Sequence, residues 1–431
     1  WRRVRSGWRA YLALAALGLC YIMLVRGPAT QALITAPVRS IAAQLFTQAK
    51  AHVYYLQLLA LPVRLNVEHQ FDVSPMVDAS VVVAAMLLGS VVAVAWALRH
   101  QLRWLALSVG WWGLLLLPTT LIPLIVLVNE HRLYLASFGV ILPVAVCLHS
   151  CGGRRRIASV PMATWALALY TIVLALLTMA RTTVWQSEVT LWADAAQKSP
   201  QMVRPHLRLA DALASKGEMA AAEVSYLRAI ALRPRHPASR NNLGSFYRSV
   251  GRLEEAETQF RELLSASPDN VPSRLNLAEL ELMRGRWSAA DAHYDTALMY
   301  DDTGGRAQVR RGQIALRFNG NASVALDYFD AAIAAGAGDD ADVHIGRGVA
   351  LRSLGLDEQA LAAYLQATAT TPGRADAWYN LGNLYLSLGR KNAALTAFQR
   401  VVDIDDDAAL VRSARTRVGD LKSRKITDSA H

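Results

Sequence analysis

The chain has 431 residues, of which 53% are hydrophobic, and its mean hydropathy is +0.21. This apolar fraction exceeds what a soluble globular protein usually carries, so it predicts membrane spans. The net charge of +11 lies entirely in residues 1–185, which hold 15 basic and four acidic residues, while the remainder balances 30 against 30. Basic residues grouped between apolar segments are typical of membrane orientation, and they exclude nucleic acid as the expected partner.

Five apolar runs approach the roughly 20 residues that a helix needs to cross a bilayer. They are residues 10–25, 77–98, 104–123, 134–149 and 157–179. Basic residues are densest before the first run, between the second and third, and between the fourth and fifth, which predicts a cytoplasmic N-terminal end. Five crossings then place everything beyond Arg181 outside. Because Arg and Ala dominate, we expect an integral protein of a bacterial inner membrane with a periplasmic C-terminal half.

A further helix is expected between the first two runs. The stretch from Ser40 to Leu61 is apolar on one side and carries Gln44, Gln48 and Lys50. This pattern predicts an amphipathic helix that lies along the outer membrane surface. The alternative is a sixth span, which would turn the C-terminal half inward; the polar residues argue against it.

The C-terminal half repeats with a period of 34 residues from Val203 onward, and Pro200, Pro234 and Pro268 mark the period. Small residues recur at Ala210, Gly244, Ala278, Gly312, Gly348 and Gly382, and aromatic residues at Tyr226, Phe260, Tyr294, Phe329, Tyr364 and Phe398. Small residues let the two helices of a hairpin approach closely, and the aromatic side chain fills the gap to the next hairpin. The pattern resembles the tetratricopeptide repeat (TPR).

The predicted fold class is all-α, with a polytopic helical membrane domain followed by a TPR solenoid. We expect the membrane domain in residues 1–184, a connecting helix in 185–202, and six repeats in 203–406. The fourth repeat has extra residues near 319–321 and after 335. Residues 407–431 predict a capping helix to Leu421 and then a disordered tail.

The first helix of each hairpin lines the concave face of such a solenoid, which predicts a groove for a protein or peptide. The candidate groove residues are Asn241, Asn242, Tyr247, Asn276, Asn380 and Tyr385. For Tyr247 and Tyr385, a packing role is an equal alternative. In the membrane half, lipids are the expected partners.

No metal-ligand spacing and no nucleotide-binding motif is present, so the sequence predicts neither a metal nor a cofactor. One polar segment does lie beside hydrocarbon: NEHRLYLAS contains Glu130, His131 and Arg132. Such groups are costly there unless they pair or meet a polar ligand such as a lipid phosphate. An interfacial ion pair between Glu130 and Arg132 is the alternative.

NEHRLYLAS resembles the ER(x)LYxPS segment of transmembrane and TPR-containing protein O-mannosyltransferases, with Ala136 where proline is usual. Residues 54–71 and 190–200 resemble the same family. The resemblance implies a GT-C glycosyltransferase that moves a sugar from a polyprenyl-phosphate donor to a protein hydroxyl, with Arg132, His131 and Glu130 near the donor phosphate.

The resemblance leaves the catalytic residues unassigned. The acidic pair of this family is expected upstream of Trp1, and Glu68 and Asp72 do not reproduce its spacing, so we expect both to be solvated loop charges. Two other functions stay open: a non-enzymatic membrane-anchored TPR scaffold, and a polymerase or ligase of surface polysaccharide.

Overall fold

The computed structural model describes residues 39–428 except 61, 64, 122–127, 129–131, 153–155, 158–159, 301–304 and 405–408. The predicted span at 10–25 lies outside the described residues. The chain divides into two compact units, Trp1–Arg233 and Pro234–His431. This boundary falls after the first predicted repeat, rather than at residue 184, because the first helix of that repeat packs against the connecting helix that precedes it.

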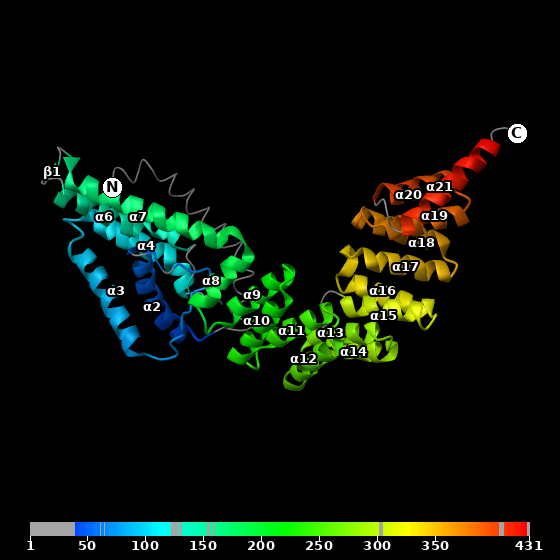
Figure 1. Cartoon of the computed structure of the whole chain (residues 1–431), viewed down its shortest axis with the longest axis horizontal. Helices are drawn as coiled ribbons and strands as arrows, with labels where there is room; N and C mark the ends of the chain where they lie inside the picture. Colours follow the sequence, from blue (N-terminus) through cyan, green and yellow to red (C-terminus); the bar gives the residue numbers. More distant parts are fainter. Residues whose placement is uncertain are drawn as a thin grey trace, which may run out of the picture. The chain divides into compact units, whose positions relative to one another are not determined.

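The first unit is built of helices (Figure 1). In chain order they are α2 (Ile41–Ala60), α3 (Ala79–Ala97), α4 (Arg103–Leu121), α5 (Leu133–Ala136), α6 (Phe138–Gly152), α7 (Met162–Thr182), the 3-10 helix η2 (Thr183–Gln186), α8 (Glu188–Lys198), α9 (Val203–Ser215) and α10 (Met219–Leu232). A short antiparallel pair, β1 (Arg156–Ile157) and β2 (Val160–Pro161), precedes α7.

Three helices in the described part of the chain are long and apolar enough to cross a membrane: α3, α4 and the continuous helix Thr164–Gln186. Their large apolar side chains point outward, and Trp96 is 68% exposed. The predicted span at 134–149 is divided between α5 and α6.

Helix α2 forms where the sequence predicted it, but its polar side faces the protein. Gln44 and Gln48 are buried, and Gln44 Nε2 donates to the carbonyl of Thr119 in α4 at 2.8 Å. In contrast, Ile41 is 70% exposed. The amide nitrogen of Gln44 thus has its partner on a helix that is distant in the sequence.

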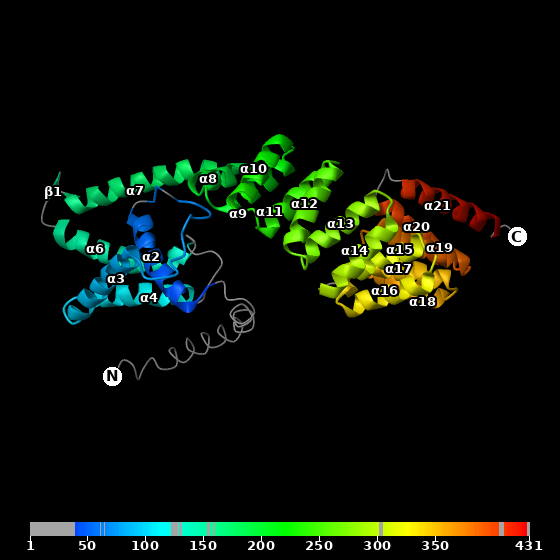
Figure 2. The ribbon, with the colours of Figure 1, turned by 90° about the horizontal axis from the view of Figure 1, so that it is seen from below.

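The second unit continues the repeats as stacked helical hairpins (Figure 2). The helices are α11 (Pro237–Ser249), α12 (Leu253–Ala266), α13 (Val271–Met283), α14 (Trp287–Tyr300), α15 (Arg306–Arg317), α16 (Ala322–Ala334), α17 (Ala341–Ser353), α18 (Asp357–Thr370), α19 (Ala375–Ser387), α20 (Lys391–Ile404) and α21 (Ala409–Asp428). A 3-10 helix, η3 (Ala337–Asp339), takes up extra residues of the fourth repeat.

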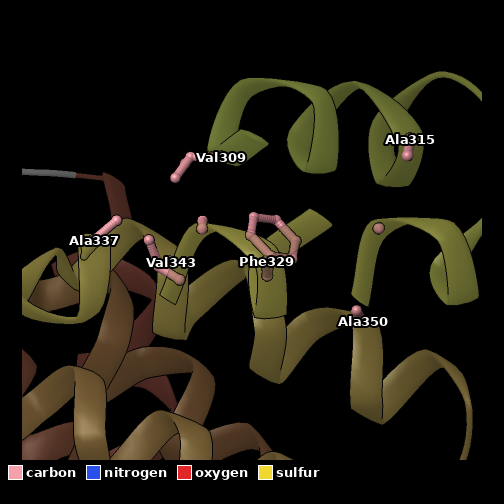
Figure 3. Packing of buried hydrophobic residues seen from close by; sticks show 8 residues of the cluster. Val309, Ala315, Phe329, Ala337, Val343 and Ala350 are labelled. Carbon is pink, nitrogen blue, oxygen red and sulfur yellow. The ribbon is translucent and has the colours of Figure 1, made fainter. Parts of the chain in front are cut away.

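The recurring aromatic residue fills the space between successive hairpins. Phe329 of α16 is fully buried between α15, through Val309 and Ala315, and α17, through Val343 and Ala350 (Figure 3). A Cβ atom on Gly346 would lie 2.2 Å from Cζ of Phe329. The close approach of α17 to this ring therefore requires glycine at that position.

Helix α21 closes the stack as the sequence predicted. It buries Val411, Ala414 and Val418 against the α20 side of the core. The helix continues to Asp428, past Leu421 where a disordered tail was expected to begin.

Candidate functional site

The first helices of the hairpins in the second unit form the inner wall of the solenoid. Helix α11 packs directly on α13, α15 on α17, and α17 on α19. Because the first helices approach one another this closely, they lie on the concave side of the curve. The side chains that they present there form the candidate binding face.

A group of amides and hydroxyls joins α11 to α13 on this face. Asn276 Nδ2 donates to Asn241 Oδ1 at 2.9 Å and to Ser245 Oγ at 3.4 Å, and Ser273 Oγ donates to Asn241 Oδ1 at 3.1 Å. Both asparagines are half-buried. Among the described residues, Asn241 Nδ2 and Asn276 Oδ1 have no hydrogen-bond partner, so one donor and one acceptor stay open side by side.

An ion pair continues the polar face from α13 to α15. Arg310 Nε donates to Glu279 Oε1 at 2.8 Å, and Arg310 also donates to Gln313 Oε1 at 2.8 Å. The pair joins the two helices across this face.

The remaining predicted groove residues fall into two groups. Asn242 and Asn380 are half-buried on α11 and α19. Tyr247 is only 6% exposed and lies under the guanidinium of Arg252, 4.3 Å from its ring centre. Tyr385 packs against the hydrophobic core clusters. These contacts support a packing role for Tyr247, whereas Tyr385 is only half-buried.

Sequence reasoning missed Ser245, Glu279, Arg310 and Gln313 on the same face. Ser245 follows Asn241 by four residues, and Glu279 follows Asn276 by three, so each lies one helical turn further along. That spacing was the signal that would have found them.

The predicted phosphate-binding segment is described only in part, because Glu130 and His131 lie outside the described residues. Arg132 stands immediately before α5, and the charge of Arg39, just before α2, is close enough to interact with it. In the described part of the chain, no group of three His, Cys, Asp or Glu side chains is placed to hold a metal ion.

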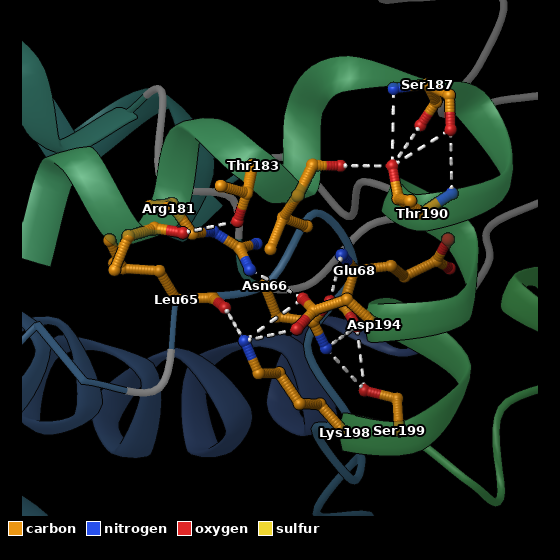
Figure 4. Close-up of polar contacts among 12 residues, drawn as sticks. Leu65, Asn66, Glu68, Arg181, Thr183, Ser187, Thr190, Asp194, Lys198 and Ser199 are labelled. Atoms are coloured by element: carbon orange, nitrogen blue, oxygen red, sulfur yellow. Dashed lines mark hydrogen bonds and ion pairs between the residues drawn. The ribbon is translucent and has the colours of Figure 1, made fainter.

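Within the first unit, the connection between α2 and α3 is fastened to the helices that begin the repeats (Figure 4). Asn66 Nδ2 donates to Ser199 Oγ at 2.9 Å and to the Glu68 carbonyl at 2.7 Å, and Ser199 Oγ donates to that same carbonyl at 2.8 Å. All three residues are buried. The polar groups of this connection are thus satisfied by a segment far away in the sequence.

Charged groups reinforce this junction. Asp194 of α8 accepts from Arg181, in the last turn of α7, at 2.6 Å, and pairs with Lys198 at 2.8 Å. Lys198 Nζ also donates to the Leu65 carbonyl at 2.8 Å. The candidate membrane helix that ends at η2, the α2–α3 connection and α8 are therefore held together by one network.

Glu68 belongs to the junction and is not a solvated loop charge as expected. It is 7% exposed, and its carboxylate lies 3.4 Å from Arg204 Nε at the start of α9. Burial raises the pKa of Glu68, while the charge of Arg204 acts in the opposite direction.

Models of the tetratricopeptide repeat match residues 207–271, 247–314, 348–389 and 375–407. The chain therefore contains tetratricopeptide repeats. Similar solved structures include YrrB, described as a TPR protein with an unusual peptide-binding site (21% identity over 44% of this chain and 97% of YrrB, TM-score 0.36). Another is a tetratricopeptide repeat protein of Parabacteroides merdae, with 17% identity over 53% of this chain and 91% of that protein and a TM-score of 0.42. A third is yeast Tom70, with 15% identity over 55% of this chain and 58% of Tom70 and a TM-score of 0.40. The comparison with curated proteins found no match.

Proposed function

We propose that the chain is a membrane-anchored TPR scaffold whose concave face binds an extended segment of another polypeptide. The observation that carries this proposal is the open donor on Asn241 beside the open acceptor on Asn276. A peptide group offers one carbonyl and one N–H, which complement these two positions. Because these two positions complement a peptide group, the ligand's backbone is the feature that they recognise.

The anchor in this proposal is the set of α3, α4 and the helix Thr164–Gln186, whose outward-facing apolar side chains suit a lipid environment. The distribution of basic residues between the apolar runs supports an extracytoplasmic position for the repeats, in a bacterial inner membrane. Reporter fusions after Pro268 test this placement, and a cytoplasmic signal there would contradict it.

Peptide selection tests the binding face. A library of displayed random peptides is selected on the full chain in detergent, and the enriched peptides are titrated by fluorescence anisotropy. We expect Asn241→Ala with Asn276→Ala to weaken binding about thirtyfold, since each of the two lost hydrogen bonds contributes about 1 kcal/mol. Peptides that bind the double variant as tightly as the wild type would place the binding surface elsewhere.

A narrower second proposal is that the complete protein transfers a sugar from a polyprenyl-phosphate donor to the bound polypeptide. Its support is the resemblance around NEHRLYLAS and the place of Arg132 immediately before α5. A guanidinium group suits a phosphate, because it can donate two hydrogen bonds to it. Here Arg132→Ala abolishes transfer and Arg132→Lys weakens it, without changing membrane insertion. Full transfer by Arg132→Ala would contradict the phosphate role.

A further inference from the structure

A pocket lies between α2, α3, α4 and α6 in the first unit. Its volume is about 210 Å³, and its walls include Leu88 and Val92 of α3, Val109 and Gly113 of α4, and Val140 of α6. Val92 is 55% exposed, so this wall reaches the outer surface of the helices. Since no Asp, Glu, Lys or Arg lines the pocket, it suits an uncharged hydrocarbon segment.

Two polar side chains that line the pocket, those of His52 and Ser108, differ in whether they have hydrogen-bond partners. His52 uses both ring nitrogens, one with Trp112 Nε1 and one with Thr120 Oγ1, each at 3.0 Å. Ser108 is 2% exposed, and its hydroxyl has no hydrogen-bond partner. A buried hydroxyl without a partner is costly, so Ser108 calls for an acceptor supplied by the occupant.

The pocket begins a short distance along α4 from a cluster of basic residues. Arg99, His100 and Arg103 lie in or beside the turn that joins α3 to α4. Ser108 follows Arg103 by five residues, or about 7.5 Å along the helix. The headgroup layer of a bilayer is about 5–7 Å thick on each side. If the basic turn lies among headgroups, Ser108 therefore lies at the border of the hydrocarbon.

The part of the pocket wall that α3 forms also lies along the helix away from the basic turn. Val92 and Leu88 precede Arg99 by seven and eleven residues, which is about 10 and 16 Å along the helix. The order from the basic turn is thus cationic groups, one hydroxyl donor, and then apolar wall. A phospholipid presents its matching groups in the same order, with phosphate, ester carbonyl and acyl chain.

We propose that this pocket holds one acyl chain of an anionic phospholipid, with its ester carbonyl accepting from Ser108 and its phosphate at the basic turn. The inference rests on the membrane placement proposed above. A prenyl phosphate has no ester carbonyl, so it leaves Ser108 without an acceptor. The ester distinguishes the two lipid classes at this site.

Two glycines on α4 give a matched pair of variants. A Cβ atom on either Gly110 or Gly113 meets no atom within 4 Å, but only Gly113 lines the pocket. Gly113→Leu therefore fills the pocket, whereas Gly110→Leu adds the same side chain on the same helix outside it. Ser108→Ala removes the hydroxyl without adding volume.

The full chain is reconstituted in nanodiscs containing phosphatidylglycerol, phosphatidylcholine and undecaprenyl phosphate, and its retained lipids are counted by native mass spectrometry. We expect one phosphatidylglycerol on the wild type and on Gly110→Leu. Retention falls at least about tenfold in Gly113→Leu and about fivefold in Ser108→Ala. The preference for phosphatidylglycerol over phosphatidylcholine disappears in Arg103→Gln.

Equal retention of phosphatidylglycerol by Gly113→Leu and the wild type overturns the inference. Preferential retention of undecaprenyl phosphate also overturns it, if Ser108→Ala leaves that retention unchanged. Membrane fractionation separates this failure from failure of the proposed function. A wild-type chain that stays in membranes but retains no phosphatidylglycerol contradicts the pocket assignment alone, whereas a chain absent from membranes contradicts the anchor.

Discussion

Asn66 and Ser199 stand 133 positions apart in the sequence, yet Asn66 Nδ2 lies 2.9 Å from Ser199 Oγ in a buried contact. Both groups also bond the Glu68 carbonyl. This triangle fixes the α2–α3 connection to the start of the repeats, next to the ion pairs of Asp194. The first repeat is consequently part of the same compact unit as the candidate membrane helices.

Removing the hydroxyl of Ser199 is expected to loosen this junction. Ser199→Ala leaves Asn66 and the Glu68 carbonyl short of a buried partner, which costs about 1–3 kcal/mol. Hydrogen exchange of the full chain in detergent should show faster exchange in residues 65–70 and in α8. The control is Ser215→Ala, because Ser215 Oγ bonds only the Ala212 carbonyl of its own helix. Unchanged exchange in Ser199→Ala would mean that the triangle does not hold the junction.

The second unit should fold alone and should depend on a glycine. Pro234–His431 has its own core, so we expect a soluble helical fragment that unfolds cooperatively in urea. Gly346→Ala forces a methyl group into the ring of Phe329 and is expected to cost about 1–3 kcal/mol. Gly373→Ala is the control, because a Cβ atom there meets nothing within 4 Å. Equal stability of the two variants would refute the packing role of Gly346.

The ion pair between Glu257 and Arg284, which joins α12 to α13, predicts a pH dependence. The hydrogen bond from Arg284 lowers the pKa of Glu257. A lowered pKa in the folded state means that the stabilisation is present above the ordinary glutamate pKa of about 4.3 and is lost as pH falls through the lower value. Glu257→Gln should therefore destabilise the fragment at pH 7 by about 1–2 kcal/mol, and the difference should be smaller at pH 3.

Urea unfolding at both pH values measures this difference. The control is Glu262→Gln, because Glu262 is half exposed in its pair with Arg240 and exposed pairs contribute little. A destabilisation by Glu257→Gln that stays constant from pH 7 to pH 3 would show that the charge of Glu257 is not its source.

The repeats could be predicted because their contacts are local. Gly312 and Phe329 belong to one hairpin, and a Cβ atom on Gly312 would lie 2.9 Å from the ring, so the sequence period directly reports the packing. The same argument located the helices of all six hairpins. Gly346, which meets Phe329 from the following hairpin, lies outside the recurring series and escaped notice.

The junction and the inward polar side of α2 could not be predicted, because their partners are remote. Nothing near Gln44 in the sequence indicates the Thr119 carbonyl, and nothing near Glu68 indicates Arg204. The groove could be predicted in part. Asn241 and Asn276 were predicted from their place on first helices, but their hydrogen bond required the structure. For Tyr247, periodicity alone did not separate packing from binding.

Site-specific photo-crosslinking tests the proposed binding face most directly. A benzophenone amino acid replaces Ser245 on α11, beside the two asparagines, or, as control, the exposed Thr258 on α12 of the same repeat. The full chain is then irradiated with a peptide selected by display. We expect a covalent adduct at position 245, reduced by excess unlabelled peptide, and none at position 258. Adducts of equal yield at both positions, or an adduct at 258 alone, would contradict the assignment of the concave face as the binding site.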